Sequence, residues 1–302
     1  MLTSHHFARA TVVGAGLMGR RIAGVLASAG LDVVITDTNA EILDAAAAEA
    51  REVTGAASGS VSATADLAAA VANTDLVVEA IIENLVVKQE LFGRLAGLAP
   101  SGAVLATNTS VLPIGAVTER VEDGDRVIGT HFWNPPDLIP VVEVIPSERT
   151  SPDTAQRVMA LLTEAGKMPV RVGRDVAGFI GNRLQHALWR EAMALVAEGI
   201  CDAQTVDLVV RNTIGLRLAA LGPLENADYI GLDLTLAIHE AVIPNINSDP
   251  HPSPLLRELV EAGHLGARTG RGFLDWPEGA REETAARLAE HISRQLNTER
   301  TS

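Results

Sequence analysis

Polar side chains follow several predicted strands in the first half of the chain, at positions with no evident packing use. Asn108-Thr109-Ser110 comes directly after an apolar run, and His131 and Asn134 follow the next one. Glu143 alternates with valines on a third predicted strand, so its side chain points to the face opposite theirs. In open α/β sheets ligands bind beyond the carboxyl ends of the strands, where Ser110 and His131 are expected to lie.

The residue types favour removal of a proton from an alcohol. Oxidation of a secondary alcohol sends a hydride to a cofactor and needs a base that works near neutral pH, a role suited to His131. A buried carboxylate needs a partner, and Glu143 bound to the other ring nitrogen would fix the tautomer and favour the imidazolium. A lone histidine is more often structural, and that interpretation stays open. Ser110 lacks a Gly-x-Ser-x-Gly elbow, so we assign it hydrogen bonding rather than nucleophilic attack.

A glycine-rich turn predicts a dinucleotide site. Gly14, Gly16 and Gly19 form G-x-G-x-x-G directly after a β-branched run and directly before a helical stretch, with Leu17 and Met18 inside the motif. The first glycine permits a tight turn, the second lets a pyrophosphate approach the backbone, and the third allows close packing of helix on sheet. The N-terminus of the helix then faces the phosphates with unpaired N–H groups.

Asp37 favours NAD over NADP. It ends the second predicted strand, 18 residues beyond Gly19, close to the roughly 20 expected of the acid that binds the ribose hydroxyls. A carboxylate there accepts from both hydroxyls and repels a 2′-phosphate. Alternatively Asp37 caps the following helix, a role that Thr38 or Asn39 can also fill.

The elements that position these residues alternate in type, which predicts a doubly wound α/β domain over residues 1–175. The predicted strands are 10–13, 33–36, 76–79, 103–107, 127–130, 141–145 and 170–172. The predicted helices, rich in Ala, Leu and Glu and free of internal proline, are 17–29, 40–53, 84–98 and 152–165.

The second half, residues 176–302, is predicted to be all-helical. From Gly178 onward the spacing predicts one buried helix face, made of Ile180, Leu184, Ala187, Leu188, Ala192 and Leu195. Further helices are expected at 202–213, 223–241, 253–263 and 281–297, separated by glycine and proline. The boundary between the two domains is placed near Arg174-Asp175.

Composition excludes several classes of function. With 24 Lys+Arg against 38 Asp+Glu, a formal charge of −14 and two lysines in all, the chain offers no basic groove for nucleic acid. No signal-peptide pattern and no run approaching 18 apolar residues is present, so we expect a cytoplasmic protein without membrane contact. Cys201 is the only cysteine and the histidines lack metal-ligand spacing, so neither a disulfide nor a metal site is expected.

Over nearly its whole length the chain resembles the 3-hydroxyacyl-CoA dehydrogenase family. The shared motifs are VVGAGLMG, DLVVEAIIENLVVKQELF, ATNTSVLPI, GTHFWNPPDLIPVVEVI, GFIGNRL, GPLENADYIGLD and TGRGFLDW. The resemblance implies an N-terminal Rossmann-type domain, NAD as cofactor, a role in fatty acid metabolism and a homodimer formed by the helical domain.

The resemblance also implies roles for individual residues. His131 would be the general base and Glu143 its partner, while Ser110 and Asn182 would contact the substrate oxygens. Asn134 would lie beside the nicotinamide, Glu83 and Lys88 would lie along the cofactor, and Asn108 would also bind the cofactor.

Two substrate classes stay open, a 3-hydroxyacyl thioester of CoA and a free hydroxy acid. Residues 38–74 contain Arg51 as their only cation, whereas thioester-specific relatives carry lysines there to hold the CoA nucleotide. The runs HFWNPP and GLRLAALGPLENAD are similar to relatives that act on free acids, such as gulonate 3-dehydrogenase and its lens-crystallin relative. Arg211 and Arg217 would then receive a substrate carboxylate, or they are solvated arginines on a helix face.

A non-catalytic, crystallin-like protein that binds NAD is a further alternative, although it would have no use for a base–carboxylate pair. For the homodimer, the apolar residues beyond the needs of one small helical layer are Leu208, Val209, Leu218, Leu221 and Leu224. The alternative is that they form a core within one chain.

Overall fold

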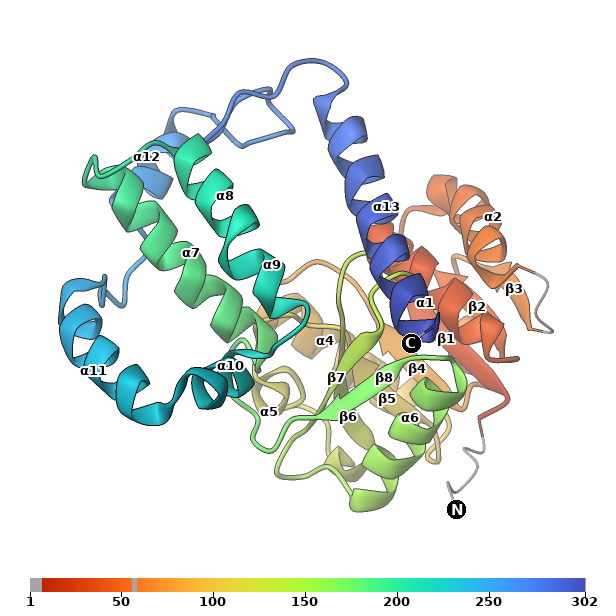
Figure 1. The fold of residues 1–302 in the computed structure, drawn as a ribbon. Helices are drawn as coiled ribbons and strands as arrows, with labels where there is room; N and C mark the ends of the chain where they lie inside the picture. The colour runs from red at the N-terminus through yellow and green to blue at the C-terminus, as the bar shows by residue number, and fades with distance from the viewer. Residues whose placement is uncertain (1–6, 56–58, 302) are drawn as a thin grey trace. The chain divides into compact units, whose positions relative to one another are not determined.

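A computed structural model describes residues 7–55 and 59–301 (Figure 1). The chain divides into two compact units, Met1–Arg183 with Leu296–Ser302, and Leu184–Gln295. The first unit therefore extends past Arg174-Asp175, where the sequence analysis places the domain boundary.

The first unit is built on an eight-stranded sheet, in the order β3-β2-β1-β4-β5-β6-β7-β8. The strands are β1 (Arg9–Val13), β2 (Asp32–Thr36), β3 (Ser60–Ala63), β4 (Leu76–Glu79), β5 (Val104–Thr107), β6 (Val127–Phe132), β7 (Val141–Pro146) and β8 (Met168–Arg171). Neighbours are parallel from β3 through β6, β7 runs antiparallel to β6, and β8 is parallel to β7. Seven predicted strands are confirmed within a few residues, and β3 was missed.

Helices connect the strands and cover the sheet. They are α1 (Leu17–Ser28), η1 (Ala40–Ile42), α2 (Leu43–Thr54), α3 (Leu67–Val71), α4 (Leu85–Leu98), α5 (Ile114–Val117), η2 (Gly124–Arg126) and α6 (Pro152–Glu164). All four predicted helices are present, with 40–53 divided into η1 and α2. The doubly wound α/β fold is confirmed.

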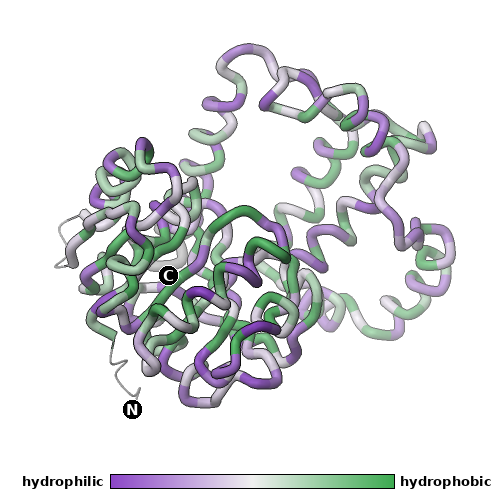
Figure 2. The backbone as a smooth tube through the Cα atoms, turned by 180° about the vertical axis from the view of Figure 1, so that it is seen from behind, coloured by the Kyte–Doolittle hydropathy of each residue, from purple (hydrophilic) through white to green (hydrophobic). Residues whose placement is uncertain are grey.

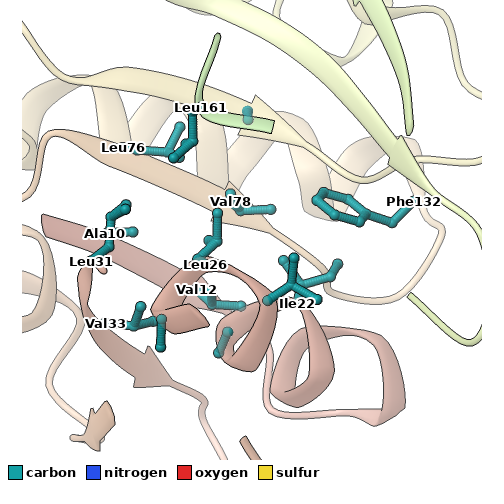
Figure 3. Packing of buried hydrophobic residues seen from close by; sticks show 14 of the residues in the cluster. Ala10, Val12, Ile22, Leu26, Leu31, Val33, Leu76, Val78, Phe132 and Leu161 are labelled. Atoms are coloured by element: carbon teal, nitrogen blue, oxygen red, sulfur yellow. The ribbon is translucent and has the colours of Figure 1, made fainter. Parts of the chain in front are cut away.

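Each face of the sheet carries its own hydrophobic cluster. Val12 and Val78 belong to one cluster, and their chain neighbours Val13 and Val77 belong to the other. This alternation follows from the two-residue repeat of a strand. Figure 3 shows the first cluster, in which Ile22 and Leu26 of α1 pack over the central strands. The carboxyl ends of the parallel strands are thereby held on a rigid core.

The second unit contains helices with almost no buried surface of their own. These are α7 (Gly181–Ala197, which begins in the first unit), α8 (Ala203–Asn212), α9 (Ile214–Leu218), α10 (Pro223–Ile230), α11 (Leu232–Val242), η3 (Ile243–Asn245), α12 (Pro254–Glu261) and α13 (Ala280–Thr301, which ends in the first unit). Helical content is as predicted, although 223–241 is interrupted at Gly231, whose φ is +100°, and α9 was missed. Figure 2 shows hydrophobic stretches along these helices as well as in the strands.

The predicted buried face of α7 is wrong for the single chain. Ile180, Leu184 and Leu188 are 45%, 60% and 40% exposed. Ala194 is the one buried residue of 184–295. The helical repeat correctly identifies an apolar face, but nothing in this unit covers it. Among the described helices, none combines the length and apolar character that a membrane span requires.

Candidate active site

His131 and Glu143 meet across the antiparallel pair β6 and β7. They are direct cross-strand partners, so both side chains lie on one face of the sheet. His131 Nδ1 and Glu143 Oε2 are 2.7 Å apart, and both side chains are buried. The expected base–carboxylate pair is therefore brought together, with Nε2 of the ring left for a substrate.

The second oxygen of Glu143 is held by the backbone. Glu143 Oε1 accepts from the N–H groups of Ile180, at 2.9 Å, and Gly181, at 3.1 Å. Phe179, just before them, has a φ of +47°, a conformation that turns the chain toward the carboxylate. Burial would raise the pKa of Glu143, but the hydrogen bonds from His131, Gly181 and Ile180 outweigh it and lower the pKa. The carboxylate thus stays ionised beside the imidazole.

Aromatic rings enclose the imidazole. The ring of Trp133 lies 4.9 Å from that of His131 and the ring of Phe179 lies 5.8 Å from it, measured between centroids. Gly181 packs against the indole so closely that an added Cβ would meet Trp133 Cζ2 at 2.2 Å. These contacts hold the ring in one orientation and limit the water around it.

Ser110 lies in a loop that is fastened from two sides. Asn182, which is buried, donates from Nδ2 to the Ser110 carbonyl at 2.9 Å. Glu83 Oε1 accepts from Ser110 N at 3.1 Å, from Val111 N at 3.3 Å and from the Thr109 hydroxyl. Asn182 and Ser110 are thus neighbours, as the resemblance implies, and Asn182 fixes the backbone that presents the serine.

Lys88 lies beneath this loop rather than on a surface. It is 1% exposed, and its ammonium contacts Glu79 Oε1 at 2.6 Å and Glu83 Oε2 at 3.3 Å. The hydroxyl of Thr107 donates to the other oxygen of Glu79 at 2.7 Å. Any effect of Lys88 on a cofactor therefore passes through Glu83, whose side chain is 36% exposed.

The glycine motif has the backbone that a dinucleotide needs. Gly14 has a φ of +108°, and an added Cβ would meet Ala80 O at 2.6 Å. At Gly19 an added Cβ would lie 1.8 Å from Gly14 O, which confirms the close packing expected there. Gly16 faces open space, with nothing within 4 Å of such an atom, and it begins α1 without a side-chain cap. Free N–H groups and room therefore coincide, and the motif fits a pyrophosphate.

Asp37 joins this motif to a cavity of about 960 Å³ lined by Gly14, Asp37, Thr38, Leu67, Ile81 and other residues. Its oxygens accept from Ala15 N at 2.8 Å and from Asn39 N at 2.9 Å. Asn39, not Asp37, caps η1 by accepting from Glu41 N. The cavity fits an adenosine, with Asp37 beside the glycine loop.

Leu17 and Met18 begin α1 between Gly16 and Gly19, with Leu17 47% exposed. Asn108 follows β5 and accepts from Phe132 N at 2.9 Å, which ties the ends of β5 and β6 together. Asn134 lies exposed in the β6–β7 connection.

Sequence reasoning missed Glu79, Thr107, Trp133 and Phe179. A glutamate ending the apolar strand DLVVE was a signal for the first of these, whereas the backbone of Phe179 leaves no mark in the sequence.

Two of the three arginines considered for substrate anions are bound to backbone carbonyls. Arg51 donates from Nε and Nη2 to Val61 O, at 3.2 and 2.9 Å. Arg211 is exposed and donates to Asp207 O of its own helix, and Arg217 is exposed on α9. In the described part of the chain, no group of three or more His, Cys, Asp or Glu residues is arranged to hold a metal ion.

Comparison with known proteins accounts for both units. Residues 9–176 match the family model for the 3-hydroxyacyl-CoA dehydrogenase NAD binding domain, and residues 178–276 match that for the C-terminal domain of the same family. A probable 3-hydroxybutyryl-CoA dehydrogenase of Deinococcus radiodurans is 38% identical over 276 residues, covering 87% of this chain and 98% of the relative.

Three further comparisons name two different substrates. The 5-formyl-3-hydroxy-2-methylpyridine 4-carboxylate 5-dehydrogenase of Mesorhizobium japonicum is 32% identical over 92% of this chain and 93% of its own. A solved structure with that activity in its description superposes with a TM-score of 0.88, at 31% identity, over 97% and 98% of the two chains. The (S)-3-hydroxybutyryl-CoA dehydrogenase structure from Ralstonia eutropha gives 0.72, at 31% identity, over 90% and 100%. With both domains matched, the chain belongs to the 3-hydroxyacyl-CoA dehydrogenase family and is an NAD-dependent oxidoreductase.

Proposed function

We propose that this chain interconverts a 3-hydroxyacyl substrate and its 3-oxo product, with His131 as the base and Glu143 as its partner. The observation that carries the proposal is the buried 2.7 Å contact between His131 Nδ1 and Glu143 Oε2 at the end of β6. A crystallin-like binding protein would not need it.

Bound NAD supplies the hydride acceptor. His131 takes the hydroxyl proton at Nε2, and Glu143, fixed by three hydrogen bonds, stabilises the imidazolium that forms. The Ser110 hydroxyl donates to the substrate oxygen, with Asn182 holding that loop and contacting the substrate beside it. The rings of Trp133 and Phe179 exclude water from the imidazole.

For the cofactor, we assign the pyrophosphate to the loop and first turn of α1, with Gly14, Gly16, Leu17, Met18 and Gly19. Asp37 binds the adenosine ribose and selects NAD against NADP because its charge opposes a 2′-phosphate. At the nicotinamide end lie Asn108, Asn134 and Glu83, with Lys88 acting through Glu83.

A free hydroxy acid is a second candidate for the substrate, favoured by the engagement of Arg51. That guanidinium, the only cation of residues 38–74, is bound to Val61 O, so this segment leaves no cation for the CoA phosphates. The relative whose description names a pyridine carboxylate supports this candidate.

We further propose that residues 1–175 form the NAD-binding domain, and that residues 176–302 bind substrate and form a homodimer in the cytoplasm. Leu208, Val209, Leu218 and Leu224 are 58%, 52%, 46% and 81% exposed and Leu221 is partly buried, so these five residues form no core within one chain. A second copy of the chain is the natural cover for them.

The mechanism is tested by a double-mutant cycle with the substrate that gives the highest NADH production among 3-hydroxybutyryl-CoA, free 3-hydroxybutyrate and gulonate. We expect His131→Ala to lower kcat by about 10² to 10⁴-fold and the double variant with Glu143→Gln to be little worse. The control is His251→Ala, which breaks a 2.8 Å contact with Asp249 on an exposed surface and should leave kcat unchanged. Full turnover in His131→Ala would contradict the assignment.

The same screen separates the two substrate candidates. With a CoA thioester as substrate, removing the CoA nucleotide to leave the pantetheine thioester should cost little in kcat/KM if residues 38–74 do not bind it. A loss of about 10²-fold or more would mean that remote binding energy is used in the transition state, against the free-acid candidate.

A further inference from the structure

Lys167 is a buried cation that the proposed mechanism does not use. It lies directly before β8 and is 8% exposed. Its ammonium donates to three backbone carbonyls, those of Pro136 at 2.5 Å, Ile139 at 3.0 Å and Asp137 at 3.2 Å. An ammonium has three N–H donors, so all of them are directed to one short segment.

The same segment is also bound by a residue of α1. Arg21 donates from Nη1 to both carboxylate oxygens of Asp137, at 2.9 and 3.2 Å, and from Nε to Glu49 at 3.1 Å. Arg21 lies in the helix that the glycine motif begins. The β6–β7 connection, residues 133–140, is therefore tied to β8 by Lys167 and to the nucleotide-binding helix by Arg21.

The connection itself carries the nicotinamide end of the candidate site. It begins with Trp133, whose ring touches that of His131, and with Asn134, which is exposed. Pro135 O accepts from the N–H groups of Leu138 and Ile139, so the segment is a closed turn. Because Lys167 binds the carbonyls of this turn, it also restrains the positions of Trp133 and Asn134 at the start of the connection.

The electrostatics of Lys167 indicate that its contacts with the connection are specific. Burial lowers the pKa of Lys167, and the charge of Asp137 opposes that shift. A buried ammonium is costly unless it is fully hydrogen-bonded, and here every acceptor comes from the connection and none from the strand beside β8. The segment that gains order from this arrangement is the connection.

We propose that Lys167 and Arg21 are positioning residues that hold residues 133–140 against the nicotinamide half of the bound dinucleotide. Neither touches the reacting atoms. Lys167 sets the turn, and Arg21, through Asp137, couples it to the helix that receives the pyrophosphate. The inference rests on the proposed function, because it needs NAD in the site assigned above.

The test compares NADH with ADP-ribose, which shares the rest of the dinucleotide but lacks the nicotinamide. Dissociation constants are measured by calorimetry for the full-length protein and for Lys167→Met. We expect the dissociation constant of NADH to rise by about three- to tenfold, the effect of one or two lost hydrogen bonds. The dissociation constant of ADP-ribose should change by less than about twofold. Arg51→Gln is the matched control, since it also removes a cation from a backbone carbonyl, that of Val61 in the edge strand β3 rather than one of the connection, and it should leave the ratio unchanged.

Asp137→Asn is the second variant, in case Lys167→Met does not fold. It keeps the carbonyl contacts of Lys167, weakens the link to Arg21 and removes the carboxylate charge near Lys167, and it should lower the preference for NADH by about threefold. If the intact protein prefers NADH and both variants keep that preference, or if both ligands weaken equally, the positioning role is overturned and the proposed function stands. If the intact protein binds neither ligand, both are overturned.

Discussion

The two units of this chain bury their side chains very differently. In the first, two hydrophobic clusters cover both faces of an eight-stranded sheet, and even the charged pair Lys88 and Glu79 is buried with partners. In the second, Ala194 is the one buried residue of 184–295. The first unit has the buried core that a stable domain needs, whereas the second leaves apolar side chains of its helices exposed.

α11 makes the contrast clearest. All its residues but Thr235 are exposed, including Leu232, Leu234, Leu236 and Ile238, which alternate along the helix and so point to several sides. A helix that is apolar on all sides is ordinarily buried. The first unit thus carries the proposed chemistry, and the helical unit exposes the apolar surface that the proposed dimer would cover.

The largest effect is expected from a charge placed in α11. Leu236→Asp should weaken the dimer by about a thousandfold, because a carboxylate buried without a partner costs several kcal/mol. Sedimentation velocity over a concentration series measures it. Val86→Asp is the control, since Val86 is 54% exposed in the first turn of α4, where a negative charge is favourable. A wild-type protein that is monomeric at micromolar concentration would remove the dimer altogether.

This contrast also explains what could be predicted. The strands β1, β2 and β4 each contain two or more adjacent β-branched residues and were found, whereas β3, Ser-Val-Ser-Ala at the edge of the sheet, has a single one and was not. The periodicity of α7 identified its apolar face, but periodicity does not tell whether the same chain covers it. The sequence therefore predicts the apolar face, and the homodimer that would cover it stays a prediction.

In the candidate site, too, some residues could be predicted from the sequence and others could not. His131 and Glu143 could be paired because alternation along a strand and a buried carboxylate are both readable from sequence. Phe179 and Lys167 could not be assigned, because a φ of +47° and three contacts to the carbonyls of another loop depend on tertiary structure.

A matched pair of glycine substitutions separates stability from binding within the first unit. Gly19→Ala would place a Cβ 1.8 Å from Gly14 O, a backbone atom, so we expect a loss of about 3 kcal/mol or more in unfolding free energy. In Gly16→Ala the added Cβ meets nothing within 4 Å, so this variant should be as stable as the wild type. Its affinity for NADH should nevertheless fall, because the methyl group fills the space for the pyrophosphate. Urea denaturation and calorimetry test the two effects. Equal stability of both variants would contradict the packing argument.

Asp37→Ser tests the charge at the ribose end of the cavity. The preference for NAD over NADP in kcat/KM should narrow by about tenfold, because removal of one repulsive charge near a phosphate is worth about 1.4 kcal/mol in a partly solvated site. Asp66, which also lines the cavity but caps α3 by accepting from Ala68 N and Ala69 N, is the control as Asp66→Asn. Equal use of NADP and NAD by the wild type would remove Asp37 from cofactor selection.

The smallest effect is a pH dependence of stability confined to the first unit. The pKa of Glu143 is lowered in the folded chain, since the hydrogen bonds of His131, Gly181 and Ile180 outweigh burial. A carboxyl with a depressed folded pKa adds stability above its unfolded pKa of about 4.3, and this stability is lost as pH falls through the lower folded value. Glu143→Gln removes the titration, so the stability difference between wild type and variant should shrink as pH is lowered from 6 toward about 3. Urea unfolding followed by the fluorescence of Trp133, with Trp189 and Trp276 replaced by phenylalanine, reports on this unit alone. A difference that is constant with pH would mean that the carboxylate is not stabilised by its partners, and the ionised Glu143 required beside His131 would lose its support.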